Sequence, residues 1–262
     1  MRLAPGALED TIRGNCMTRR RMGSFILVAI VLVLGQLATA MPSDAADGIN
    51  GAHWARKNNP FTLKIGDNVD NSWDGYLKRA ASDWNKSKVV NTDVVGGSAG
   101  SRCKPTDGRV EVCNDRYGAT GWLGITEVYA DSHDHIIAAR CLMNDTYFST
   151  SHYDDPTAKR HTMTHEMGHS LGLDHRSGKS VMNDSESAVF RYDRPTSNDY
   201  DKLEQIYRHK DKTTTVDAAE APFSVASIDP GIPTVAKDAG PVSVRNLDNG
   251  GKVITYITRP NE

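Results

Sequence analysis

The most informative segment of the sequence is His165-Glu-Met-Gly-His-Ser-Leu-Gly-Leu-Asp-His175. Residues four apart share one face of an α-helix, so His165 and His169 can present two imidazoles to the same point. Gly172 stands one turn further on, where a residue free to adopt positive φ can turn the chain sharply out of the helix. Such a turn would bring His175 back beside the other two histidines.

Three imidazoles around one point indicate a catalytic zinc site. Histidine nitrogens are common zinc ligands, and three of them leave one tetrahedral position open, as catalysis requires. A bound zinc ion activates water and polarises a substrate carbonyl. Glu166, next to the first ligand, can take a proton from that water and return it to the leaving group. The sequence therefore predicts one catalytic Zn²⁺ bound by His165, His169 and His175, with Glu166 as the catalytic base.

Another histidine, His161, lies one turn before His165 and shares its helical face. Three histidines at this spacing on a straight helix spread over about 12 Å. They cannot all reach one ion at a ligand distance of about 2.1 Å. Only two consecutive histidines can do so, and the positions of Glu166 and Gly172 select the pair at 165 and 169. We therefore expect His161 to lie outside the metal site.

Ser180-Val181-Met182 follows the third histidine closely. The pattern H-E-x-x-H-x-x-G-x-x-H, followed by a methionine turn, resembles the metzincin clan of zinc metallopeptidases. The Gly-Leu-x-His sequence and the short spacing between His175 and Met182 are most similar to matrixin-type members, especially small bacterial secreted ones. The resemblance covers roughly residues 55–208 and is densest over 121–207. It implies that Met182 lies beneath the metal, and that Gly121-Trp-Leu-Gly-Ile-Thr126 is the edge strand along which an extended peptide pairs through main-chain hydrogen bonds.

The sequence departs from that family in its accessory features. It contains no Pro-Arg-Cys-Gly propeptide switch. His133, Asp134 and His135 invite comparison with the family's structural zinc site, but the full ligand set is not at its customary places. Four acidic residues offer the oxygen ligands that calcium prefers: Asp131, Asp145, Asp154 and Asp155. Acids in loops are usually just solvated, so Ca²⁺ or a second Zn²⁺ is only an alternative here.

Hydrophobic periodicity predicts a mixture of strands and helices. Strand-like alternation occurs at residues 61–65, 89–95, 109–113, 121–130 and 135–143. Helices are predicted at 73–86 after an N-cap at Ser72, from the N-cap Asp155 and Pro156 to about Leu171, and after a capping box of Thr196 and Asp199. We expect an α+β (mixed α/β) fold with a twisted five-stranded sheet and three main helices. The resemblance implies that this is a metzincin-like zincin fold.

The amino terminus has the features of an export signal. Arg13 and three consecutive arginines at 19–21 precede an apolar run over 25–34, and Ala38-Thr-Ala40 follows. A basic flank, a short apolar core and an A-x-A site predict a secretory signal that is removed after about residue 40. The alternative is a membrane anchor, because residues 22–41 could just span a bilayer. The true start codon stays open, and we expect a secreted, extracellular protein.

Composition and motifs divide the whole chain into four segments. We predict a signal peptide at 1–40, a short N-terminal segment at 41–54 and a zinc metallopeptidase catalytic domain at 55–210. Residues 211–262 read as a linker and a C-terminal tail, in which 242–258 alternate around Asp248-Asn-Gly-Gly251 and could form one hairpin. A lone hairpin is marginal in water, so this one must dock on the domain or stay mobile.

Cysteine usage agrees with export, which permits disulfides. Cys103 and Cys113 are ten residues apart across a turn-rich segment, and we expect them to pair. Cys141 would then be unpaired and buried in a strand. A bridge between Cys141 and either of the other two is the alternative, because an odd count forbids pairing all three.

Composition limits the classes of function. The 262 residues are 38% hydrophobic and 24% charged, with ordinary glycine and proline usage, which excludes collagen-like and wholly disordered proteins. A formal net charge of −2 gives no basic excess for binding nucleic acid. We expect a monomeric secreted zinc endopeptidase that acts on protein or peptide substrates, with no nucleic acid and no stable membrane partner once the signal is cleaved. The alternatives are a catalytically silent zinc-binding or adhesion module of the same fold, and a hydrolase of non-peptide amides.

Overall fold

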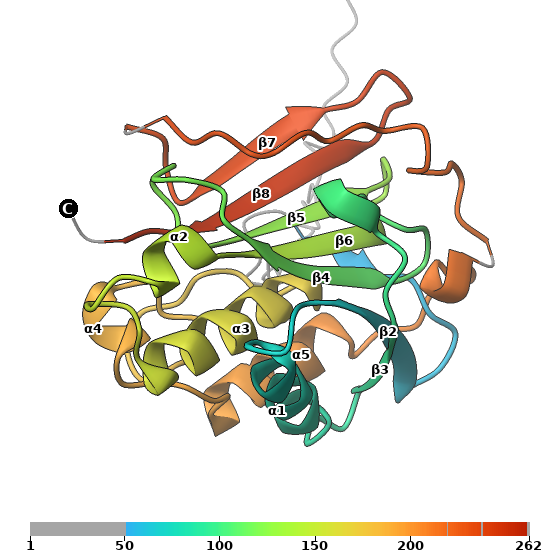
Figure 1. Cartoon of the computed structure of the whole chain (residues 1–262). Helices are drawn as coiled ribbons and strands as arrows, with labels where there is room; N and C mark the ends of the chain where they lie inside the picture. The colour runs from blue at the N-terminus through green and yellow to red at the C-terminus, as the bar shows by residue number, and fades with distance from the viewer. Residues whose placement is uncertain (1–50, 219, 237, 261–262) are drawn as a thin grey trace, which may run out of the picture. The chain divides into compact units, whose positions relative to one another are not determined.

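A central mixed sheet organises the protein, and helices pack on one side of it (Figure 1). The computed structural model describes residues 51–218, 220–236 and 238–260. The predicted signal peptide lies outside these described residues. Within them the sheet has eight strands and is accompanied by five α-helices.

The strands are β1 (His53–Trp54), β2 (Phe61–Asn68), β3 (Val90–Gly96), β4 (Val110–Asp115), β5 (Gly124–Ala130), β6 (His135–Asn144), β7 (Val242–Asn246) and β8 (Lys252–Thr258). Their order across the sheet is β3-β2-β4-β6-β5-β8-β7, and β1 pairs with the start of β6. The pairs β2–β3, β2–β4, β4–β6 and β1–β6 are parallel. The pairs β5–β6, β5–β8 and β7–β8 are antiparallel.

All five predicted strands are present as β2 to β6, but the prediction of a five-stranded sheet was incomplete. β1 has two residues, which is too short for alternation to be visible in the sequence. β7 and β8 form the hairpin considered for 242–258, and β8 finds its partner in β5. A hairpin that is marginal alone gains the hydrogen bonds and the packing surface of a larger sheet by docking in this way. The domain boundary at residue 210 stays a prediction.

The helices are α1 (Asp74–Trp84), α2 (Asp145–Phe148), α3 (Pro156–Ser170), α4 (Glu186–Val189) and α5 (Ser197–Ile206). The three longer helices are those predicted from periodicity, whereas α2 and α4 have four residues each, too few for a periodic pattern. The side chain of Asp155 caps α3, and Thr196 forms a capping box with Asp199.

One predicted cap is wrong. The residue at the N-cap of α1 is Trp73, without a side-chain cap, rather than Ser72. The hydroxyl of Ser72 donates instead to Oδ1 of Asp70, so it is turned away from the helix.

Tryptophan and tyrosine side chains join the three longer helices beside the sheet. Trp84 of α1 is completely buried, and its indole nitrogen donates to the carbonyl of Thr164 in α3 at 3.0 Å. Tyr200 of α5 packs edge-on against Trp84, and its hydroxyl donates to the carbonyl of Asp83 at 2.7 Å. Each ring therefore buries apolar area while its polar atom is satisfied. This arrangement fixes α3, which carries the histidine motif, between α1 and the sheet.

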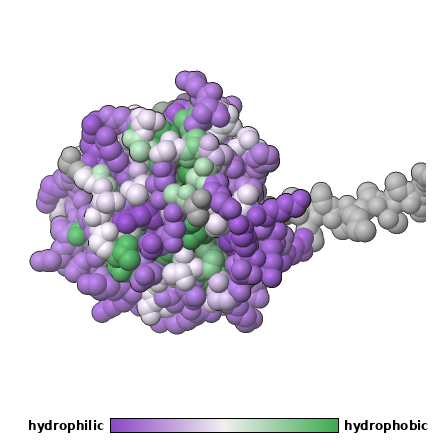
Figure 2. Space-filling view, turned by 90° about the vertical axis from the view of Figure 1, so that its right-hand side faces the viewer, coloured by the Kyte–Doolittle hydropathy of each residue, from purple (hydrophilic) through white to green (hydrophobic). Residues whose placement is uncertain are grey.

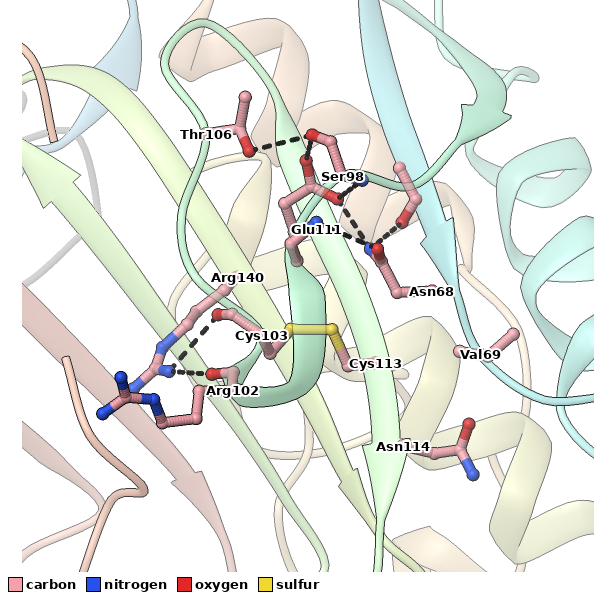
Figure 3. Close-up of a disulfide and its surroundings, with 12 residues drawn as sticks. Asn68, Val69, Ser98, Arg102, Cys103, Thr106, Glu111, Cys113, Asn114 and Arg140 are labelled. Carbon is pink, nitrogen blue, oxygen red and sulfur yellow. Dashed lines mark hydrogen bonds between the residues drawn. A yellow bond between two sulfur atoms is a disulfide. The ribbon is translucent and has the colours of Figure 1, made fainter. Parts of the chain in front are cut away.

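The disulfide between Cys103 and Cys113 is confirmed (Figure 3), and Cys141 is free and buried in β6. The bridge ties the turn around Gly100–Arg102 to β4. The buried guanidinium of Arg140 donates to the carbonyls of Arg102 at 3.1 Å and of Cys103 at 3.3 Å, so the turn is also held from the side of β6.

The surface is mainly polar. On the face drawn in Figure 2, hydrophilic residues predominate and apolar residues lie in small separate groups. Of the large hydrophobic side chains in the described part of the chain, only Ile232 and Val244 are exposed. Among the helices of the described residues, none is both long and apolar enough to cross a membrane.

Candidate active site

The histidine motif lies at the buried end of α3. His165, Glu166 and His169 are completely buried there, and the helix ends at Ser170. Gly172 then adopts φ +97°, which confirms the turn predicted from the sequence. A β-carbon at this position would lie 2.7 Å from the carbonyl oxygen of Ala52, so only glycine fits both the dihedral angle and the space.

The turn brings the third histidine back to the helix. Nε2 of His165 lies 2.9 Å from Nε2 of His169. The ring of His175 has its centre 5.1 Å from that of His165 and 4.6 Å from that of His169. One ligand atom from each of the three lies within 4.8 Å of the other two. The structure thus brings together the three histidines that the sequence proposed as ligands.

His161 does not join this group. Its ring is stacked obliquely beside His165 with 5.3 Å between the centres, and its Nδ1 lies 2.7 Å from the carbonyl oxygen of Tyr192. Burial lowers the pKa of His161 to about 4, so the side chain is neutral. It is therefore a buried packing residue one turn away from the three converging rings.

Backbone carbonyls orient two of the ligand candidates. Nδ1 of His165 lies 2.7 Å from the carbonyl oxygen of Val181, and Nδ1 of His169 lies 2.7 Å from that of Leu173. Because a carbonyl oxygen only accepts, each Nδ1 must carry the hydrogen, and each Nε2 keeps a lone pair facing the centre. Both ring nitrogens of His175 are buried and have no hydrogen-bond partner among the described residues. A metal ion would satisfy this donor set.

The protonation states of the histidines also suit a metal. Burial lowers the pKa of His165 and His169 well below the usual value, and the neighbouring imidazoles act in the same direction. Burial lowers the pKa of His175 as well, against the opposing charge of Asp184. All three are therefore neutral at pH 7, the form in which histidine binds metal ions.

The carboxylate of Glu166 is held by two hydroxyl groups. Thr126 of β5 donates to Oε2 at 2.7 Å, and Thr258 of β8 donates to Oε1 at 2.6 Å. Burial raises the pKa of Glu166 to about 8, although both hydroxyls oppose the shift. Gly124 is needed beside it, because a β-carbon there would collide with the same carboxylate. Sequence reasoning did not identify either threonine. Thr126 lay within the predicted edge strand, whereas nothing in the sequence marked Thr258.

The methionine turn lies directly under α3. Met182 is completely buried, and a β-carbon on Gly168 would collide with its Sδ. The preceding carbonyl, that of Val181, is the acceptor that orients His165. The turn therefore supports the histidine group both by packing and by a hydrogen bond.

The C-terminal strand covers the histidines. β8 runs antiparallel to β5 in a register from Gly124 opposite Thr258 to Ala130 opposite Lys252. The ring of Tyr256 stacks on His169, with 4.1 Å between the centres and 9° between the planes. Its hydroxyl donates to Oδ1 of Asp174 at 2.7 Å. Tyr256 and Thr258 are buried, so this strand closes the site from the side of the sheet.

Each of the loop acids considered for calcium has a protein partner in the structure. Asp155 caps α3, Asp154 pairs with Lys159, Asp145 accepts from the indole of Trp73, and Asp131 accepts backbone N–H groups of the turn that follows it. In the described part of the chain they belong to no group of three ligands that could hold a metal. His133 also belongs to none, whereas His135 lies beside His53 and Asp211.

Comparisons with known proteins give only a loose structural similarity. No family model and no curated protein matches this chain. A solved structure that is similar is high choriolytic enzyme 1, a hatching enzyme zinc-protease from Oryzias latipes (Medaka fish). It shares 9% sequence identity, and the match covers 62% of this chain and 97% of that one, with a TM-score of 0.36. So loose an overlap assigns neither a fold family nor an activity, which must come from the residues themselves.

Proposed function

We propose that this protein is a zinc-dependent endopeptidase of metzincin type. The observation that carries the proposal is the convergence of three neutral imidazoles, two completely buried and the third half-buried, with Glu166 on and just after one helix. The helical spacing, the turn at Gly172 and the supporting Met182 all accord with it. The narrower, matrixin-type assignment is a proposal based on the Gly-Leu-x-His sequence and the short spacing between His175 and Met182.

The chain's own residues have distinct parts in this reaction. His165, His169 and His175 would hold the zinc ion, which when bound polarises the scissile carbonyl and activates water. Two backbone carbonyls fix the orientation of His165 and His169. Oε2 of Glu166 is anchored by Thr126. Once Thr258 has left, Oε1 is available to accept a proton from water and to return it to the leaving amine.

Secretion and partners are also part of the proposal. The disulfide between Cys103 and Cys113 supports an oxidising compartment. We propose a monomer that acts on protein or peptide substrates outside the cell. N-terminal sequencing of exported protein and its mass in solution test these two points, and a mature chain starting near residue 41 is the expected result.

A second candidate is a catalytically silent zinc module. The observation that favours it is the position of β8, because Thr258 engages Glu166 and Tyr256 covers His169. A permanently closed site would bind zinc and turn over no peptide. The two candidates therefore differ in hydrolysis and agree in metal content.

The test is hydrolysis of a quenched fluorescent peptide library by the zinc-loaded full chain. Because Tyr256 of β8 covers His169 and Thr258 engages Glu166, the double variant Tyr256→Ala/Thr258→Val is assayed beside the wild type. We expect hydrolysis that a chelator abolishes and added zinc restores. Zinc binding without hydrolysis in either chain would favour the silent module and contradict the proposed enzyme. Cleavage confined to non-peptide amides would contradict the proposed substrate class.

A further inference from the structure

A second group of metal-ligand side chains lies outside the candidate active site. His53 of β1, His135 at the start of β6 and Asp211 after α5 each present one ligand atom within 4.8 Å of the others. His209 adds an Nε2 that lies 3.1 Å from Nε2 of His53 and 3.4 Å from Oδ1 of Asp211. Segments from three distant parts of the sequence meet at this point.

Backbone pairing fixes the positions of these residues. In the parallel pair of β1 with β6, His53 stands opposite His135. The N–H of His53 donates to the carbonyl of Asp134 at 3.0 Å, and the N–H of Asp211 donates to the carbonyl of Arg56 at 3.0 Å. Backbone hydrogen bonds therefore fix where His53, His135 and Asp211 stand.

The partners of the Nδ1 atoms of His53 and His135 determine which ring nitrogen of each histidine can bind a metal ion. Nδ1 of His53 lies 3.1 Å from the carbonyl oxygen of Gly51, and Nδ1 of His135 lies 3.4 Å from Oδ2 of Asp131. The carbonyl of Gly51 accepts from Nδ1 of His53 and leaves the lone pair of that ring on Nε2, and the carboxylate of Asp131 beside Nδ1 of His135 favours the same tautomer there. This is the arrangement by which protein groups orient metal-binding histidines.

These lone pairs face a carboxylate. Nε2 of His53 lies 3.5 Å from Oδ1 of Asp211, and Nε2 of His135 lies 3.7 Å from the same oxygen. Oδ2 of Asp211 is already engaged by the guanidinium of Arg56 at 2.6 Å. Lone pairs and a carboxylate oxygen gathered in this way form a donor set that suits a metal cation.

We propose that His53, His135, His209 and Asp211 bind a structural zinc ion. Tetrahedral zinc with ligands at 2.0–2.1 Å places its ligand atoms about 3.3–3.4 Å apart. The distances that join His53, His209 and Asp211 to one another are 3.1, 3.4 and 3.5 Å, and His135 lies 3.7 Å from Asp211. His135 belongs to the group through His53 and Asp211, and His209 is added as the fourth ligand. Imidazole nitrogens and one carboxylate suit zinc, and four protein ligands leave no open position for substrate. The ion would fasten β1 to β6 and to the segment that follows α5.

Metal content of the zinc-loaded full chain tests this site. We expect two zinc ions per chain in the wild type and one in Asp211→Asn, which removes the charge but keeps the size of the side chain. His133→Ala is the matched control, because His133 stacks beside His135 without joining the group, and it should keep both ions. A wild-type chain that binds one ion, or an Asp211→Asn chain that still binds two, would overturn the proposal.

A second variant, at the more exposed ligand His209, keeps the test valid if Asp211→Asn fails to fold. The side chain of His209 is 47% exposed, so His209→Ala should fold normally. We expect its second zinc to bind at least about tenfold more weakly than in the wild type, because three ligands remain instead of four. Unchanged affinity of both ions would remove His209 from the site and contradict the four-ligand proposal.

A different observation, the pairing of β8 with β5, supports a second inference, which rests on the proposed function. Without β8, β5 would present a row of free backbone N–H and C=O groups at the edge of the sheet, and such an edge pairs readily with an extended peptide. β8 occupies that edge along its whole length, from Gly124 to Ala130. It therefore fills the position in which an extended substrate would lie beside Glu166.

The side chains of β8 also disable the catalytic groups. Thr258 donates to Oε1 of Glu166, while Thr126 already occupies Oε2. Each oxygen of the carboxylate therefore already accepts one hydrogen bond from the protein. Tyr256 stacks on His169 and excludes solvent from the face of that ring. We infer that the C-terminal strand is a built-in inhibitor, and that the enzyme becomes active when β8 leaves β5.

Full-length variants with a weakened strand test this inference. Tyr256→Ala combined with Thr258→Val removes both contacts, and we expect kcat/KM for peptides to rise at least about tenfold over the wild type. Thr255→Val is the matched control, because alternation along the strand turns Thr255 to the opposite face, and it should leave the rate unchanged. Hydrogen exchange of the β5 amides gives an independent readout and should accelerate only in the double variant.

The outcomes separate this inference from the proposed function. Equal hydrolysis by the wild type and the double variant would contradict inhibition by β8 while leaving the enzyme in place. Fast exchange at β5 with zinc bound, but no hydrolysis in any chain, would contradict the enzyme itself and with it the inhibitory strand. Slower hydrolysis in the double variant would show that β8 assists the reaction, which also overturns the inference.

Discussion

The hydroxyl of Thr258 donates a hydrogen bond of 2.6 Å to Oε1 of Glu166, across 92 residues of sequence. This contact joins the end of the chain to the carboxylate that the motif marks as the general base. It means that the chemistry predicted from one eleven-residue stretch depends on a strand that no motif identifies. The state of β8 is therefore expected to decide how much of the site's activity is measured.

The ligand set is tested by zinc content at two neighbouring histidines. His175→Ala should lose tight zinc binding at the motif, because two imidazoles make a weak site. His161→Ala should keep the ion, since its ring lies outside the group of three. Atomic spectroscopy of purified, folded variants gives the answer. The reverse pattern would mean that the chain does not turn back at Gly172, and the assignment of the ligands would fail.

Gly172→Ala should destabilise the protein and weaken zinc binding. The positive φ of +97° and the collision with the carbonyl of Ala52 together should cost about 1–3 kcal/mol. Gly178→Ala is the control, because Gly178 also has positive φ, +82°, but has open space around it. Urea denaturation and zinc titration should show the larger loss at Gly172. Equal losses in both variants would mean that the contact with Ala52 has no effect.

We predict that the carboxylate of Asp83 contributes to stability in a pH-dependent way. Burial raises its pKa, but hydrogen bonds from Lys86 and Arg160 outweigh burial and lower it below the ordinary value. A lowered folded-state pKa stabilises the protein above the unfolded pKa of about 4, and the contribution disappears as the pH falls through the folded value.

Asp83→Asn should therefore cost about 1–3 kcal/mol at pH 7 and progressively less below pH 4. Unfolding free energies measured by urea at several pH values check this, with the exposed Asp201→Asn as the control. A cost that is the same at pH 7 and pH 3 would show that packing rather than charge explains the effect.

Removing the disulfide should lower stability without removing the site. A closed loop spanning ten residues contributes about 2–3 kcal/mol in the chain-entropy description. The double variant Cys103→Ser/Cys113→Ser should show this loss in urea denaturation and keep zinc at the motif. Cys141→Ala should keep the bridge intact in mass mapping, because Cys141 is free. Detection of free thiols at both 103 and 113 in exported wild-type protein would contradict the pairing.

Local signals made much of the fold predictable. Hydrophobic alternation located β2 to β6, and the cap residues Asp155 and Thr196 placed the starts of α3 and α5. The group of His165, His169 and His175 was equally predictable, because a helix and one glycine turn bring its members together within eleven residues. Each of these features is determined by residues that are close in sequence.

Long-range pairing is what the sequence did not reveal. β8 resembles many short alternating strands, and nothing in residues 252–258 states that its partner is β5. The second histidine group is scattered in the same way, since His53 and His135 meet only through the pairing of β1 with β6. Such contacts depend on the assembled sheet, so a motif search along the chain cannot find them.

The most direct test of the central claim is peptide hydrolysis and zinc content of Glu166→Gln, measured in the Tyr256→Ala/Thr258→Val background, in which both side-chain contacts of β8 with the site are removed. We predict that the ion bound by His165, His169 and His175 is retained, because all three imidazoles remain. Hydrolysis should fall by about 10²–10⁴-fold, the usual contribution of a general base. Retained hydrolysis with retained zinc would contradict the assignment of Glu166 as the base, and with it the mechanism proposed for this protein.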